Sequence, residues 1–171
     1  SITFQRMVSH DGVGVSTLEI FDVMRHRTQI AFTAPPKRAI FAPRWNKDGT
    51  QLVFEYLAKA SPAIDADVTG NALAVVDLTA AKPTAREITK VEDRCSNPDW
   101  SWVNDRIVCS KPVSTTGYDG PADIVMVRPG SQTGFLAMTA VAADGRQAVM
   151  PTWLPDGSGI VFADWGGAMS T

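Results

Sequence analysis

The sequence predicts an all-β fold built from a repeated four-stranded unit, and two observations lead to this prediction. A twelve-residue pattern occurs three times, and its tryptophans lie 55 and 53 residues apart. Apolar, strand-like runs also follow each copy at matching positions. A fixed period of this size is typical of repeat proteins, in which each unit packs on its neighbours. The chain is therefore expected to form a series of stacked units.

Each copy of the pattern predicts a tight hairpin of two strands. The copies run over 43–54, 98–109 and 151–162, with a proline two residues before the tryptophan and an aliphatic pair seven and eight residues after it. Proline is tolerated at the start of a strand, where its missing N–H is not needed. Asp48-Gly49 and Asp156-Gly157 are turn dipeptides, because glycine accepts the positive φ of such turns. Asn104 stands at the glycine position in the middle copy and is the next best residue there.

The remaining strands complete a unit of four. Alternating or apolar runs at 18–23, 73–78 and 124–127 predict a third strand in each unit, and a fourth ends at 31–33, 87–89 and 137–139. Four short strands in up-and-down order form the blade of a β-propeller. The predicted divisions are the last three strands of a partial blade at 1–33, complete blades at 41–89 and 96–139, and the first two strands of another blade at 149–171.

The pattern Pro-x-Trp-x-x-Asp-Gly-x-x-(Leu/Ile)-Val-Phe resembles the repeat of TolB-like, WD40-like (PD40) β-propellers. Those repeats are close to Pro-x-Trp-Ser-Pro-Asp-Gly followed by an apolar strand. In the middle copy, Trp102 and Val103 replace the Pro-Asp of the motif. The resemblance implies a partial propeller and an extracytoplasmic location, periplasmic or extracellular, and it carries little information about activity.

A propeller buries the faces of its blades by closing a ring of roughly four to eight blades. Partial repeats leave unpaired strand edges, which favour aggregation. We therefore expect the chain to be a portion of a longer propeller. The isolated 171-residue chain should be insoluble, oligomeric or marginally stable unless partner strands complete it.

The charge and hydropathy of the chain argue against two classes of partner. The net charge is −2 and the pI about 5.6, so the composition gives no basic footprint that would argue for nucleic acid or an anionic membrane as partner. No stretch approaches 18 consecutive apolar residues, so no membrane span is predicted.

Partner binding is predicted at the rim that carries the longer loops. The connections 9–16, 58–71 and 110–121 between second and third strands should lie on the same face as 34–39, 90–95 and 140–147, and long loops on a rigid scaffold commonly bind partners. The candidate residues are Asp65, Asp67, Tyr118, Asp119, Lys37, Arg38, Arg94 and Arg146. A polar surface with Tyr118 as aromatic anchor suits a protein or peptide partner. The alternative is ordinary solvated loop polarity, with the Tyr118 ring folded over its own blade.

No catalytic residues, cofactor or metal site are predicted. Asp65 to Asn71 begins like a calcium loop, but its twelfth position is Val76, where a bidentate glutamate is required. His10 and His26 are isolated from other zinc ligands. There is no Gly-x-Ser-x-Gly elbow and no Gly-rich phosphate loop.

Cys95 and Cys109 are a candidate disulfide pair. If the middle hairpin turns around Trp102, the two cysteines face each other across the strands, close enough for a bond in some geometries. The extracytoplasmic location implied by the resemblance favours oxidation. The alternative is two buried thiols that act as small apolar residues.

Two functions are compatible with the sequence. The preferred one is a non-catalytic propeller that serves as a binding or scaffold surface in an extracytoplasmic assembly. The alternative is the propeller domain of a larger enzyme, such as a prolyl-oligopeptidase-like serine hydrolase, in which the ring gates access to a catalytic domain outside this chain.

Overall fold

The computed structural model of the chain describes residues 1–113, 120–130 and 134–166. These residues form thirteen strands and two short 3₁₀ helices: β1 (Ile2–His10), β2 (Val13–Asp22), β3 (Arg27–Thr33), β4 (Arg38–Trp45), β5 (Gln51–Lys59), β6 (Val68–Asp77), β7 (Ala85–Glu87), η1 (Val91–Asp93), β8 (Ser96–Trp100), β9 (Ile107–Pro112), β10 (Ala122–Val127), β11 (Leu136–Ala137), η2 (Val141–Asp144), β12 (Gln147–Trp153) and β13 (Ile160–Trp165).

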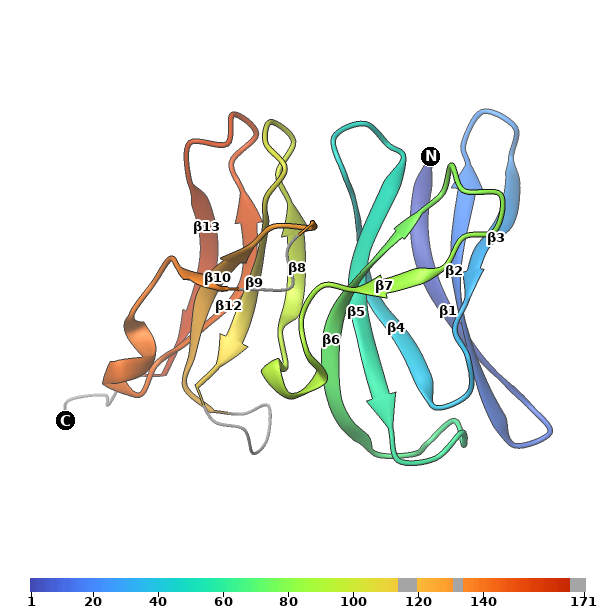
Figure 1. Cartoon of the computed structure of the whole chain (residues 1–171), viewed down its shortest axis with the longest axis horizontal. Helices are drawn as coiled ribbons and strands as arrows, with labels where there is room; N and C mark the ends of the chain where they lie inside the picture. The colour runs from blue at the N-terminus through green and yellow to red at the C-terminus, as the bar shows by residue number, and fades with distance from the viewer. Residues whose placement is uncertain (114–119, 131–133, 167–171) are drawn as a thin grey trace.

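The strands form small antiparallel sheets in chain order. The first is β1-β2-β3, the second β4-β5-β6-β7 and the third β8-β9-β10 with β11 on β10. The hairpin β12-β13 joins the third sheet only through one parallel pair, Ala122 with Gln147. Figure 1 shows the sheets standing side by side, from β1–β3 at one end to β12–β13 at the other. The chain is thus all-β, a β-propeller of four-stranded antiparallel blades with two complete blades and a partial blade at each end.

The hydrophobic core lies between the sheets, in three clusters. One is centred on Leu52 and Phe54 against the first sheet, and the next on Val53 and Trp100 between the second and third sheets. A third surrounds Trp153, between the third sheet and β12–β13. Successive residues of a strand point to opposite faces of its sheet. Leu52-Val53-Phe54 is therefore continuously apolar because each face of β5 packs on a different neighbouring blade.

The Pro-x-Trp segment forms the same irregularity in three strands. The ladder register shifts at this point in β4, β8 and β12, between Phe41 and Arg44, Ser96 and Asp99, and Val149 and Thr152. The residues before the prolines, Ala42, Asn97 and Met150, have φ of 47°, 50° and 53°. A bulge bends its strand and re-aims the side chains that follow. In each blade the re-aimed residue is the tryptophan.

The three repeat tryptophans occupy equivalent positions but are not equally buried. Trp100 and Trp153 are 2% and 8% exposed, whereas Trp45 is only half-buried beside the cluster around Leu52. The difference arises because Trp45 also borders an open cavity, which is described below.

One predicted long connection is wrong, and another is held by specific contacts. The segment 9–16 is mostly strand, because β1 and β2 join through a two-residue turn, Asp11-Gly12, with positive φ at both residues. The loop 60–67 between β5 and β6 packs back on β2, where the Gly14 N–H donates to the Pro62 carbonyl at 2.7 Å. The buried Lys59 ammonium donates to the carbonyls of Ala63 and Ile64 and so fixes the loop from inside.

Candidate binding surfaces at the two rims

The strands end on two opposite rims (Figure 1). The long-loop rim carries the turn 11–12, the loop 60–67 and the helices η1 and η2. The short-turn rim carries the three hairpin turns 46–50, 101–106 and 154–159, which follow the repeat tryptophans. Because a propeller presents its loops on these rims, each is a candidate binding surface.

Two of the predicted arginines on the long-loop rim are held by the chain itself. Arg38 pairs with the Glu87 carboxylate, lies 4.5 Å from the centre of the Tyr56 ring and donates to the Tyr56 carbonyl at 3.3 Å. Arg146 binds the Asp164 carboxylate through two guanidinium nitrogens. Both side chains therefore stabilise their own blades, and binding a partner would compete with these contacts.

The other predicted residues are more exposed or lie outside the described part. Asp65 and Asp67 are exposed on loop 60–67, and Lys37 is exposed on the segment before β4. The Arg94 guanidinium donates to the Thr69 carbonyl at 3.3 Å. The predicted aromatic anchor, Tyr118, and its neighbour Asp119 lie outside the described residues.

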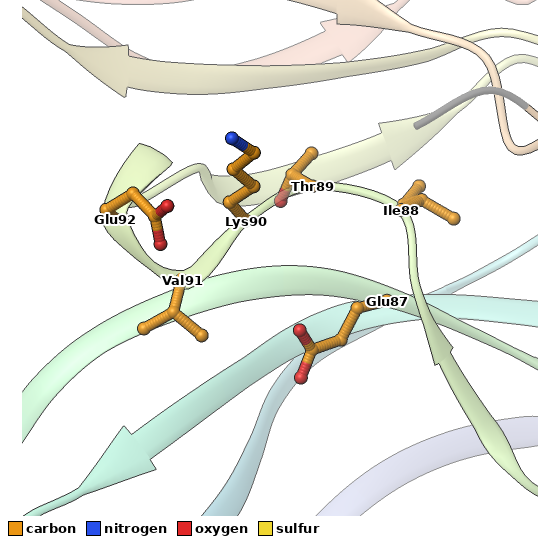
Figure 2. Close-up of a pocket in the computed structure, with 6 residues that line it drawn as sticks. All are labelled: Glu87, Ile88, Thr89, Lys90, Val91 and Glu92. Atoms are coloured by element: carbon orange, nitrogen blue, oxygen red, sulfur yellow. The ribbon is translucent and has the colours of Figure 1, made fainter. Parts of the chain in front are cut away.

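A cavity of about 300 Å³ opens at the segment from Glu87 to Glu92 (Figure 2). Its charged groups do not converge: Glu87 is paired with Arg38, and the Lys90 side chain extends to the opposite side of the segment from the Glu87 carboxylate. The Thr89 hydroxyl is used inside the fold, since it accepts the Leu73 N–H at 2.7 Å. The cavity therefore lacks a set of free polar groups aimed at one ligand atom.

The short-turn rim carries an aromatic cavity of about 330 Å³ between the second and third blades. Trp45 and Trp102 form part of its wall, together with Ser1 and the turn residues Asn46, Lys47, Asp48 and Gly49. Trp102 is 57% exposed, although tryptophan is a residue that normally buries much of its surface. Two indole rings with a mixed-charge edge suit an extended peptide carrying an apolar or proline residue.

Both turns beside this cavity are fixed by short-range hydrogen bonds. The Asn46 Oδ1 atom accepts the N–H groups of Thr50 and Gln51 at 2.9 and 3.0 Å. The Ser101 hydroxyl accepts the N–H groups of Val103 and Asn104, both at 3.3 Å. The cavity wall is therefore preorganised, which reduces the entropy that a ligand must overcome.

The turn 101–106 also touches the turn of the following blade. A Cβ atom at Gly157 would lie 2.1 Å from Val103 Cγ2, so only glycine fits there. The turn thus extends across the rim between both neighbours, with Trp102 at the cavity and Val103 against Gly157. Trp102 and Val103 are the two residues that depart from the repeat motif.

The seam between the second and third blades holds a carboxylate, Glu55. Its Oε1 atom accepts the N–H of Asn97, the bulge residue of β8, at 2.7 Å. Burial raises the pKa of Glu55 above its usual value, while the Asn97 N–H and the nearby Arg44 charge oppose the rise. The carboxylate holds the bulge in place and does not line either rim cavity.

Cys95 and Cys109 are both fully buried free thiols in the same core cluster. The predicted register is wrong, because Ser96 pairs with Ser110 and a bulge follows, so Cys109 is not directly opposite Cys95. Burial raises the pKa of the Cys109 thiol well above its usual value, and the neighbouring Cys95 raises it further. A disulfide between them stays a prediction.

Within the described part of the chain, no three His, Cys, Asp or Glu side chains lie close enough to hold a metal ion. No helix among the described residues is long and apolar enough to span a membrane.

The sequence matches no protein-family model and no curated protein. Several solved structures share the fold. Three of them are TolB from Acinetobacter baumannii (TM-score 0.57, 17% identity, 86% of this chain and 31% of that chain), oligogalacturonate lyase from Vibrio parahaemolyticus (0.67, 13%, 94% and 45%) and prolyl oligopeptidase B from Galerina marginata (0.62, 11%, 95% and 27%). At these identities the likeness shows the fold alone. This chain spans less than half the length of each.

Proposed function

We propose that the chain is a non-catalytic propeller module that binds a protein or peptide partner in an extracytoplasmic assembly, with its short-turn rim as the binding surface. The observation that carries the proposal is the cavity between Trp45 and Trp102, where a large aromatic side chain stays exposed. Exposed tryptophans in preformed pockets are the residues that dominate binding energy at protein interfaces. The extracytoplasmic location rests on the resemblance of the repeat to TolB-like proteins.

The long-loop rim remains the competing surface within this proposal. Asp65 and Asp67 are exposed there and form part of a loop that Lys59 holds in shape. Arg38 and Arg146, in contrast, already have carboxylate partners. We favour the short-turn rim because the Trp102 side chain on this rim is exposed and does not pack in the hydrophobic core.

The second candidate is the propeller domain of a larger enzyme. It is favoured by the comparisons, since the lyase and the oligopeptidase match the fold with TM-scores at least as high as that of TolB. The catalytic residues would then lie outside this chain. A Gly-x-Ser-x-Gly segment after residue 171 in the full-length protein would decide for this candidate.

The proposed binding surface can be tested with a displayed peptide library. Peptides are selected on the wild-type chain and their affinities are then measured for Trp102→Ala and Trp165→Ala. Trp165 is a matched control, because it is also 57% exposed but lies on β13, away from the cavity. Removal of an interface tryptophan typically costs about 2 kcal/mol or more, so we expect at least roughly tenfold weaker binding for Trp102→Ala alone. Equal losses in both variants, or none in either, would exclude the cavity as the binding site.

A further inference from the structure

Two arginines lie opposite each other at the short-turn end of the third blade. Ile107 pairs with Val127 at the end of the β9–β10 ladder, so the next residues outward, Arg106 and Arg128, occupy facing positions. Like charges directly opposite each other destabilise a sheet. Neither arginine takes part in any of the ion pairs found among the described residues.

A cavity of about 350 Å³ lies between the two arginines, and Asp105 and Gly130 complete its wall. Both arginines are exposed. The Asp105 carboxylate is used elsewhere, since its Oδ1 atom accepts the Trp100 indole N–H at 3.2 Å. A Cβ atom at Gly130 would meet nothing within 4 Å, so this side of the cavity is open.

A third guanidinium is held at the edge of the cavity by the neighbouring blade. Arg86 of β7 donates to the carbonyl of Pro129, which lies between Arg128 and Gly130, at 2.7 Å. Two arginines thus line the cavity with one carboxylate, and a third contacts the backbone beside it, in a chain whose net charge is −2. A concentration of positive charge against the overall sign attracts anions.

We propose that Arg106 and Arg128 form an anion-binding site that takes the carboxylate groups of an acidic segment of the partner. The arginine guanidinium presents a planar fork of donors that matches a carboxylate or phosphate group. The turn 101–106 carries both Trp102 and Arg106, so one segment could use both cavities. In this respect the inference rests on the proposed function and adds the chemistry of its partner.

The test is the affinity of a fluorescently labelled hexaglutamate peptide, measured by anisotropy at low salt with the 171-residue chain. Arg106→Gln and Arg128→Gln are tested singly and together, with Arg27→Gln, an exposed arginine on β3, as the matched control of equal charge change. We expect the double variant to bind about tenfold more weakly and the control to stay close to wild type. A loss in the control as large as that in the double variant, or no loss in the double variant, overturns the site.

Two further arms identify the anion. A peptide of phosphoserines and inorganic phosphate are used as competitors of the hexaglutamate probe. Displacement by unlabelled hexaglutamate at lower concentrations than either phosphate compound supports the carboxylate assignment. Stronger competition by the phosphoserine peptide, or by phosphate alone, overturns that assignment.

Thermal melting without added anion separates binding from folding. Because the two arginines repel each other, we expect Arg128→Gln to melt at the same temperature as the wild type or higher. A lower melting temperature together with lost binding would show that the arginines stabilise the fold and would contradict the proposed anion site.

Trp102→Ala should bind hexaglutamate as tightly as the wild type, since the probe has no apolar residue. The proposal of the anion site and the proposal of the aromatic binding site can therefore be contradicted independently of each other.

Discussion

The Asp99 carboxylate accepts a hydrogen bond of 2.7 Å from the backbone N–H of Trp153, across the boundary between the third blade and the next. The same Oδ2 atom accepts the Thr152 hydroxyl at 2.9 Å, and Oδ1 lies 3.9 Å from Arg44 Nε of the preceding blade. One buried side chain of β8 thus joins β12 and β4. Blade stacking in this chain depends on such polar contacts at the bulges as well as on apolar packing.

Asp99→Ala should destabilise the fold by about 1–3 kcal/mol, because it leaves the buried Trp153 N–H without its acceptor. Asp48→Ala is the control, since Asp48 is exposed in a hairpin turn of the short-turn rim. Urea unfolding of the two variants measures the difference. An equal loss of unfolding free energy in both variants would mean that Asp99 does not join the blades.

The repeat tryptophans should differ in their contribution to stability. Trp100→Ala is expected to cost about 3–5 kcal/mol, the usual range for a fully buried large aromatic residue. Trp45→Ala should cost clearly less, because one side of its ring faces the cavity. Chemical denaturation followed by circular dichroism compares the two. Similar losses would show that Trp45 is as buried as its counterpart.

Glu55 should make stability fall as the pH rises. Its pKa is raised by burial in the folded state, so the folded chain binds the proton more tightly than the unfolded chain. The contribution is fully present below the usual glutamate pKa and is lost as the pH rises through the folded pKa. Glu55→Gln keeps an oxygen acceptor for the Asn97 N–H and removes the charge. We therefore expect this variant to be at least as stable as the wild type at pH 7.

The melting temperatures of the wild type and of Glu55→Gln, measured between pH 4 and pH 7, test this prediction. The difference in favour of Glu55→Gln should grow with pH over this window. A variant that becomes relatively less stable as the pH rises would mean that the Arg44 charge outweighs burial.

Gly14→Ala should release the loop 60–67 from the first sheet. A Cβ atom at Gly14 would lie 2.8 Å from Ile64 Cα, so the loop must move and the bond between Gly14 N–H and the Pro62 carbonyl is strained. Overpacking of this kind typically costs about 1–3 kcal/mol. Gly130→Ala is the control, because nothing lies within 4 Å of the added carbon. Urea unfolding of both variants tests this, and a neutral Gly14→Ala would show that the loop yields freely.

The sequence predicts the strands and their order well, because Leu52-Val53-Phe54 and its counterparts carry the pattern of strands buried on both faces. The sequence-based prediction fails where a bulge or a turn sets the pairing register of two strands. The bulge at Asn97 and a turn over 101–106 place Ser96 opposite Ser110, which invalidates a register centred on Trp102. The Asp11-Gly12 turn could have been predicted, since this dipeptide is a strong hairpin signal.

The candidate sites were harder to predict than the strands. The pairing of Arg106 with Arg128 follows only from the β9–β10 ladder, and the cavity beside Trp102 only from the packing of two blades. Arg38 and Arg146 looked available in the sequence, but their carboxylate partners lie 49 and 18 residues away along the chain. Sequence position alone does not show which charges are already paired.

The location of the bound partner is the central claim, and hydrogen exchange of the chain with and without a library-selected peptide tests it most directly. Binding at the short-turn rim predicts slower exchange of backbone amides in the turns 46–50 and 101–106, with loop 60–67 unchanged. Protection confined to loop 60–67 and the segment 91–94 would contradict the claim and place the partner on the long-loop rim.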